Sequence, residues 1–129
     1  MKAAENGGRM PVYRGDIFYC DLQKKQNQGS IQYGVRPVVV LQSTKGNKHS
    51  PTTIVAPITS KNKNYLPTHA SIKPFDIRYL KTDFVNDIIL FEQITTVNMS
   101  DLKRKIGAIN LESSRIKKAL KISIGLEII

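Results

Sequence analysis

An arginine placed directly before a buried strand is the first residue in this sequence that could do chemistry. Arg36 lies in the stretch GVRPVVVLQS, in which residues 38–41 form an apolar run typical of a fully buried strand. Pro37 suits the first position of such a strand, because its missing N–H is tolerated there. Since a guanidinium keeps its charge at physiological pH, we expect it to meet an anion at the edge of the core. That anion is either a ligand or a carboxylate of the chain, such as Glu92 or Asp16.

Two histidines and one cysteine are the other residues whose side chains could react. His69 stands in LPTHASI, between a turn and a strand, where acid–base catalysis competes with the commoner structural role of a hydrogen-bonded histidine. His49 lies in a polar turn and is expected to be solvated. Cys20 lies among apolar residues of an expected strand, so we interpret it as a small buried hydrophobic residue rather than a nucleophile.

The spacing of these residues does not suit a metal or a cofactor. The two histidines are far apart in the sequence, and the single cysteine has no partner for zinc or haem ligation. No glycine-rich fingerprint for nucleotide phosphates is present. We therefore expect no metal and no cofactor.

Charge narrows the choice of partners. The chain has 20 Lys and Arg against 10 Asp and Glu, a net charge of +10, beyond the roughly 2–8 that solubility requires of a small domain. A phosphate-bearing or acidic partner is expected. A single cysteine fits a reducing compartment. The absence of a signal peptide or of an apolar run of roughly 20 residues predicts a cytoplasmic protein without membrane contact.

The length of 129 residues suits one domain. Polar residues 1–9 are expected to form a disordered extension and residues 10–129 a single domain. We expect long loops at 23–34 and 60–65, a turn at 44–51 and irregular structure at 74–87. Residues 101–109 could be a basic turn or a short strand. The expected strands are residues 16–22, 36–43, 52–59, 68–73 and 87–97.

One amphipathic helix is expected at the end of the chain. Asn110 is a good N-cap, Ile116 and Ala119 begin an apolar series at helical spacing, and Gly125 suits a C-terminal stop. Five or six strands cannot bury their apolar side chains from water unless the sheet closes into a barrel. The fold class predicted from the residues is therefore mainly β with α, a small barrel covered by a C-terminal helix.

Six blocks of the chain resemble MazF/PemK-type toxins of bacterial type II toxin–antitoxin modules. They occur in the family's order and spacing, from about Tyr13 to Leu126, and the likeness is closest to the Gram-positive branch. The blocks are YRGDIFYCDL, GVRPVVVLQS, GNKHSPTTIVAPITS, LPTH, IILFEQITTV and ALKISIGL.

The resemblance implies a small SH3-like barrel, shared with the gyrase poison CcdB, and a homodimer. It implies a metal-independent endoribonuclease (an mRNA interferase) that cuts single-stranded RNA, leaves 2′,3′-cyclic phosphate and 5′-OH ends, and is blocked by the acidic tail of a MazE-type antitoxin. The family's catalytic arginine and threonine fall on Arg36 and Thr59. The implied RNA-binding residues are Gly29, Ser30, Gln32, Tyr33, Lys61, Glu92 and Gln93.

Departures from the family pattern bear on specificity. Ile31 replaces an acidic residue of the loop, Tyr33 adds an aromatic ring that could stack on a base, and Thr95 replaces an arginine. Lys24, Lys25, Lys61 and Lys63 lie on the two loops expected to flank the groove. The alternative is a non-enzymatic module on the same fold, either a gyrase poison of the CcdB type or an inactive RNA binder.

Overall fold

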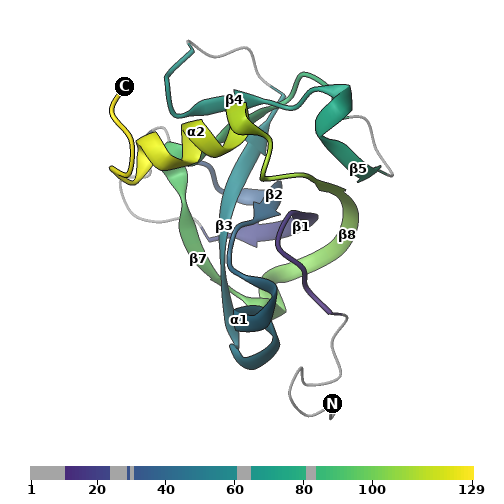
Figure 1. Ribbon diagram of the computed structural model, residues 1–129. Coiled ribbons are helices and arrows are strands. Elements are labelled where there is room, and N and C mark those ends of the chain that lie inside the picture. The colour runs from purple at the N-terminus through teal and green to yellow at the C-terminus, as the bar shows by residue number, and fades with distance from the viewer. Residues whose placement is uncertain (1–10, 24–28, 30, 61–64, 81–83) are drawn as a thin grey trace.

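A curled antiparallel sheet makes up most of the structure (Figure 1). The computed structural model describes residues 11–23, 29, 31–60, 65–80 and 84–129, so the extension expected at residues 1–9 lies outside it. The 8-stranded sheet has the order β4-β6-β3-β2-β1-β8-β5, and β7 pairs with β3. The strands are β1 Asp16–Leu22, β2 Gly34–Val40, β3 Thr52–Thr59, β4 His69–Ser71, β5 Ile77–Leu80, β6 Ile88–Leu90, β7 Thr95–Asn98 and β8 Leu102–Ile109.

The helices are short, apart from the one at the C-terminus. They are α1 Thr44–His49, the 3₁₀ turns η2 Pro74–Asp76, η3 Phe91–Gln93 and η4 Met99–Asp101, and α2 Ser114–Ser123. In Figure 1, α2 lies across one end of the sheet near β4, and α1 lies at the opposite end. The mainly β fold with a covering C-terminal helix, predicted from the sequence, is confirmed.

Side chains alternate along β1, β2 and β3, so the sheet buries both of its faces. The larger core lies on one face, where Ile17, Val39 and Ile58 pack with residues of α2 such as Ile116. The smaller core lies on the other face and contains Phe18, Cys20, Leu22, Val38, Val40, Val55 and Val97. Two-sided burial explains why residues 38–40 are apolar without alternation.

The single strand expected over residues 87–97 is wrong. β6 pairs with the end of β3, matching Ile89 with Ile58, whereas β7 pairs with its beginning, matching Thr95 with Val55. Between these two ladders the later segment has three residues more than β3, and the three-residue turn η3 takes them up. The turn buries Phe91 and carries Glu92 and Gln93 out of the sheet.

Other local expectations need correction. The turn expected at 44–51 contains helix α1, because the Ser43 hydroxyl caps it by accepting the Gly46 N–H at 3.0 Å. The region 74–87, expected to be irregular, contains η2 and the edge strand β5. Residues 102–109 form a full strand, β8, whose pairing with β1 contains register shifts that let it bend around the sheet. The strand expected at 68–73 spans only His69–Ser71.

The C-terminal helix begins later than expected. Its N-cap is Ser113, not Asn110. The Asn110 side chain instead accepts the Glu112 N–H at 2.9 Å in a turn that leads into the helix. Gly125, with φ of 79°, follows the helix as expected. In the described part of the chain no helix has both the length and the apolar character needed to cross a membrane.

Candidate active site

Arg36 lies at the start of β2, on the face that carries the smaller core. Its Nε donates to the Tyr33 carbonyl at 3.0 Å, and this bond fixes the base of the guanidinium. Asp16 pairs with Lys105 at 3.1 Å, and Glu92 contacts His69 at 2.9 Å. Within the described ranges no carboxylate forms an ion pair with Arg36. The alternative of an internal ion pair with Glu92 or Asp16 is therefore not what the structure shows.

Thr59 ends β3 and faces the same side of the sheet as Arg36. The β2–β3 ladder matches Val40 with Val55 and Val38 with Pro57. The ladder ends at this pair, and the alternation of side chains along each strand assigns Arg36, two residues before Val38, and Thr59, two residues after Pro57, to the same face. Thr59 is buried, with 6% of its surface exposed. The two strands thus present a guanidinium and a hydroxyl on one face.

Cys20 lies directly across from Arg36 on β1. The side chain is 0% exposed, as expected for a buried hydrophobic residue. Burial raises the pKa of its thiol to about 12, and the carboxylates of Asp101 and Asp21 add to the rise. The thiol therefore stays neutral at physiological pH and does not compete with a ligand for the charge of Arg36.

The segment before β2 is held by the turn η3. The Gln32 N–H donates to the Gln93 side-chain oxygen at 2.9 Å, so one expected RNA-binding residue fixes another. Gly29, with φ of 58°, adopts a left-handed turn conformation that favours glycine. Tyr33 is exposed. Ser30 and Lys61, together with Lys24, Lys25 and Lys63, lie outside the described residues.

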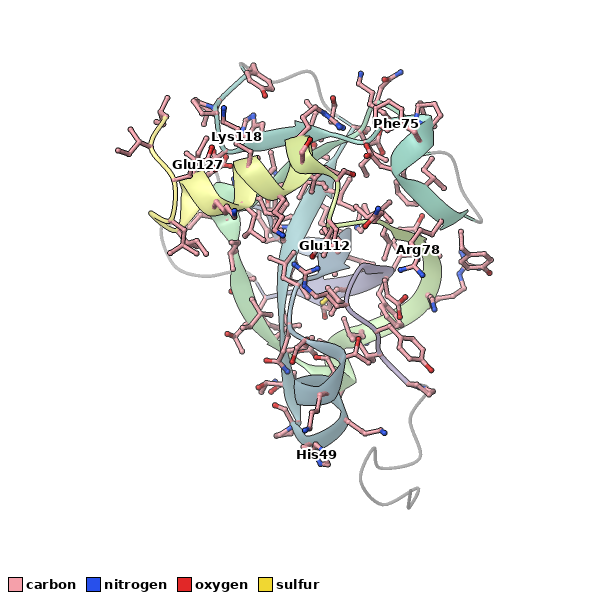
Figure 2. All side chains as sticks on the ribbon, viewed as in Figure 1. His49, Phe75, Arg78, Glu112, Lys118 and Glu127 are labelled. Carbon is pink, nitrogen blue, oxygen red and sulfur yellow. The ribbon has the colours of Figure 1, made fainter. Side chains whose placement is uncertain are left out.

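Glu92 is held from two sides by residues around the start of β4. Its Oε2 contacts His69 Nε2 at 2.9 Å, and its Oε1 accepts the Thr68 hydroxyl at 3.3 Å. His69 Nδ1 accepts the Leu66 N–H at 3.3 Å. Both ring nitrogens have a hydrogen-bond partner and the side chain is buried, as expected for a structural histidine. His49, by contrast, ends α1 at the exposed tip of the molecule (Figure 2).

A cavity of about 200 Å³ opens beside Gln32 and Gln93. The apolar side chains of Leu22, Pro57 and Val97 continue the smaller core into its lining, and Gln32 and Gln93 contribute polar atoms. Arg36 and Thr59 are not part of its lining. The cavity therefore adjoins the Gln32–Gln93 contact and is separate from the Arg36–Thr59 pair.

The contact of Thr68 and His69 with Glu92 was not predicted from the sequence. The signal was the β4–β6 pairing, which matches His69 with Leu90 and so brings the start of β4 beside η3. The β4–β6 pairing could not be predicted, because the ends of both strands were predicted wrongly from the sequence. No group of three or more His, Cys, Asp or Glu among the described side chains is arranged to hold a metal ion.

This arrangement suits a ligand that has an anionic group and further polar groups beside it. A guanidinium offers paired N–H donors to a phosphate or carboxylate, and a nearby hydroxyl can add a donor. Strand ends fix such groups better than loops do. The fold and the site define a small, basic β protein that presents an arginine and a threonine on neighbouring strands.

Sequence comparison assigns the family. A model of the PemK-like, MazF-like toxin of type II toxin–antitoxin systems matches residues 13–124. The chain therefore belongs to the PemK-like, MazF-like toxin family, and the resemblance noted in the sequence is confirmed.

Solved structures support the fold assignment. An endoribonuclease in complex with its cognate antitoxin, from a mycobacterial species, gives a TM-score of 0.68 at 20% identity, covering 90% of this chain and 97% of that chain. An endoribonuclease from a mycobacterial species gives 0.67 at 19% identity, covering 91% and 94%. The MazE–MazF complex from Deinococcus radiodurans gives 0.64 at 15% identity, covering 92% and 100%. At these identities the likeness establishes the fold.

Proposed function

We propose that this toxin is an endoribonuclease that cuts single-stranded RNA at short sequences without a metal ion. The observation that carries the proposal is the β2–β3 register, because its continuation by two residues on each strand assigns Arg36 and Thr59 to one face. The structural neighbours that are endoribonucleases support the same activity. The net charge of +10 suits a polyanionic substrate.

The proposed reaction is an internal transesterification. The 2′-oxygen attacks the adjacent phosphorus, the bond from phosphorus to the 5′-oxygen breaks, and the proton lost by the 2′-OH is balanced by one gained on the leaving oxygen. The products are a 2′,3′-cyclic phosphate and a 5′-OH. Because the reaction uses the 2′-OH, DNA is not cut.

Arg36 and Thr59 act on the phosphoryl oxygens. Negative charge grows on these oxygens in the transition state, and the fixed guanidinium of Arg36 donates to them. The Thr59 hydroxyl adds a further donor. We assign Arg36 to charge stabilisation rather than proton transfer, because a guanidinium does not give up its proton in proteins.

The remaining residues bind the RNA chain. Gly29, Ser30, Gln32 and Tyr33 belong to the loop that passes over the substrate, and the Tyr33 ring offers a stacking surface. Glu92 and Gln93 contact bases from η3, and Lys61 holds the backbone electrostatically. Lys24, Lys25 and Lys63 assist in the same way.

The proposed partners follow from family and charge. We infer a homodimer as the active form and a MazE-type antitoxin whose acidic, extended segment binds the basic toxin. Acidic residues of that segment compete with RNA for Arg36, since a carboxylate and a phosphate present similar paired oxygens. The proposed location is the cytoplasm, where mRNA is translated.

The test is to incubate the purified protein with a long unstructured RNA in excess EDTA and to analyse the ends of the products. We expect cuts at a few sequences, cyclic phosphate and 5′-OH ends, and no cut where the site carries a 2′-deoxy sugar. Arg36→Ala should fold normally and leave the RNA intact.

Two outcomes contradict the proposal. Full activity of a folded Arg36→Ala protein removes Arg36 from the mechanism. An RNA left intact by folded, antitoxin-free protein favours the non-enzymatic alternative, and inhibition of gyrase supercoiling is then the assay that identifies a gyrase poison.

A further inference from the structure

Glu92 lies on the short turn η3, and both of its carboxylate oxygens are in contact with neighbouring residues. One of its oxygens contacts His69 Nε2, and the other accepts the Thr68 hydroxyl. Its side chain is still 33% exposed. The carboxylate is therefore fixed in orientation while part of it stays open to solvent.

The tautomer of His69 follows from its two contacts. Nδ1 accepts the Leu66 N–H, so it carries no hydrogen. The ring hydrogen is then on Nε2, which donates to Glu92 Oε2 at 2.9 Å. The contact is then a hydrogen bond from the imidazole N–H to the Glu92 carboxyl group.

The ring of His69 is itself fixed. It is 2% exposed, and the Tyr65 ring meets it edge-on at a centroid distance of 6.3 Å. Backbone bonds connect the same elements, since the Phe91 N–H donates to the Thr68 carbonyl at 3.2 Å. Thr68 and His69 thus hold the Glu92 side chain in one orientation.

We propose that Thr68 and His69 are positioning residues that hold Glu92 as an acceptor for the amino group of one RNA base. The inference rests on the proposed ribonuclease function. A carboxylate accepts from the exocyclic amines of adenine, cytosine and guanine but faces carbonyl oxygens on both sides of the single N–H of uracil. Glu92 therefore selects an amino-bearing base over uracil at one position.

Two substitutions of His69 separate positioning from folding. In His69→Gln, the side-chain amide nitrogen lies near the place of Nε2 and keeps a donor for Glu92, but the acceptor for Leu66 is lost. In His69→Asn, the side-chain oxygen lies near the place of Nδ1 and keeps the Leu66 contact, but the donor to Glu92 is lost. If His69 only stabilised the fold, His69→Gln would be impaired at least as much as His69→Asn.

The experiment measures kcat and KM of both variants, of Glu92→Gln and of the wild type, on short RNAs that differ by one base at each position of the cleaved sequence. For His69→Asn we expect KM to rise on the order of tenfold, as for a lost bond to a charged group, with kcat nearly unchanged. His69→Gln should stay within about threefold of the wild type, taking such a bond as mostly retained. Glu92→Gln should lose the discrimination against uracil at one position, because its amide also donates.

The outcomes distinguish the two levels of the argument. Equal KM values for the two His69 variants, or unchanged base preference in Glu92→Gln, overturn the inference and leave the ribonuclease function standing. A wild-type protein that cuts none of the RNAs overturns the proposed function, and the inference with it. Melting temperatures of all variants show that the compared proteins are folded.

Discussion

At the scale of single residues, chemistry depends on which polar groups are already occupied. Arg36 uses Nε to hold the Tyr33 carbonyl, and Cys20 across the strand stays a neutral thiol. Asp16 and Glu92 are engaged by Lys105 and His69. Among the described residues no carboxylate neutralises the charge of Arg36, which is consistent with the proposed contact of this residue with RNA phosphate.

Two threonines on β3 allow catalysis and folding to be separated. Thr53 and Thr59 lie on the same face of the strand, and the Thr53 hydroxyl donates to the Asn47 side chain at 2.6 Å. We predict that Thr59→Val lowers kcat by 10-fold or more, on the order of one charge-assisted bond in the transition state, and lowers the melting temperature little. Thr53→Val should cost about 0.5–1.5 kcal/mol, the loss of one hydrogen bond, because Gln42 Nε2 still donates to the same Asn47 oxygen at 3.0 Å, and it should keep kcat.

Thermal unfolding and single-turnover cleavage of the two variants provide the check. If Thr59→Val lost more stability than Thr53→Val and kept its kcat, Thr59 would be a structural residue.

Cys20 gives a second prediction at this scale. Because burial raises the pKa of its thiol to about 12, the reactive thiolate is nearly absent at pH 8.5. We predict that iodoacetamide leaves the folded protein unmodified and adds one carbamidomethyl group in guanidinium chloride, as measured by mass spectrometry. Rapid modification of the folded protein would show that this part of β1 opens to solvent, contrary to its place in the smaller core.

At the scale of elements, the turn before β1 determines how three strands meet. Gly15 donates its N–H to the Val40 carbonyl at 2.8 Å, and its own carbonyl accepts the Ile109 N–H at 2.9 Å. Its φ is 97°, and an added Cβ would lie 2.5 Å from the Ile109 oxygen. Gly34 also has a positive φ, of 81°, but an added Cβ there meets nothing within 4 Å.

These two glycines form a matched pair for mutation. We predict that Gly34→Ala costs about 1–2 kcal/mol, the penalty of a left-handed backbone alone. Gly15→Ala should cost clearly more, because it adds a clash with backbone that cannot move without breaking the β1–β8 pairing. Chemical denaturation measures both, and equal losses would mean that the turn at Gly15 relaxes without disturbing the strands.

A buried carboxylate, Asp76 of η2, anchors the start of the C-terminal helix. Asp76 is 0% exposed and accepts the Ser113 hydroxyl at 2.6 Å, the Arg115 guanidinium at 2.8 Å and the Lys73 N–H at 2.8 Å. Burial alone would raise its pKa, but the bonds from Arg115, Ser113 and Lys73 outweigh it and lower the pKa below the usual value. Lys118, in the middle of the same helix, pairs with Glu127, which follows the helix, and both side chains are solvent-exposed (Figure 2).

Acid should release this attachment. A lowered pKa in the folded state contributes stability above the unfolded value, and this contribution is lost as the pH falls below about 4. We predict that Asp76→Asn is less stable at pH 7 and loses less further stability between pH 5 and pH 2 than the wild type. Urea unfolding at each pH measures this, and parallel stability profiles would contradict the prediction.

The same attachment predicts a contrast along α2. Arg115→Ala leaves a buried carboxylate without its cation and should cost toward the lower end of roughly 3–5 kcal/mol, since the guanidinium is partly exposed. Lys118→Ala removes only an exposed pair at 3.9 Å and should cost about 0–1 kcal/mol.

The elements also show how far sequence reasoning reaches. β1 and β3 were predicted at their observed bounds, because apolar β-formers bounded by polar turns leave few alternatives. The run 87–97 was predicted as one strand, because no glycine or proline interrupts it to mark the turn η3. The turn η3 forms because β6 and β7 pair with different parts of β3. Such pairing between residues distant in the sequence is a long-range property. Arg36 was recognised from local sequence, whereas the support of Glu92 by His69 depends on that long-range pairing.

At the scale of the whole molecule, the excess of positive charge governs encounter with RNA. A net charge of +10 raises the local concentration of a polyanion and makes its binding salt-dependent. Each phosphate neutralised on a single strand contributes about −0.7 to the slope of log K against log salt. Cations that contact the RNA affect this slope, whereas cations elsewhere on the surface affect it little.

This distinction gives the last prediction. With Arg36→Ala as a background that binds RNA without cutting it, we predict that a further Lys61→Ala makes the slope less negative by about 0.7, the loss of one phosphate contact. Lys118→Ala, which removes the same charge from the exposed face of α2, should leave the slope unchanged. Fluorescence anisotropy of a labelled RNA measures the binding of both variants at about 50 to 300 mM salt, where counterion release dominates. Equal changes in slope would mean that the protein attracts RNA through its net charge alone, and the phosphate contact assigned to Lys61 would be wrong.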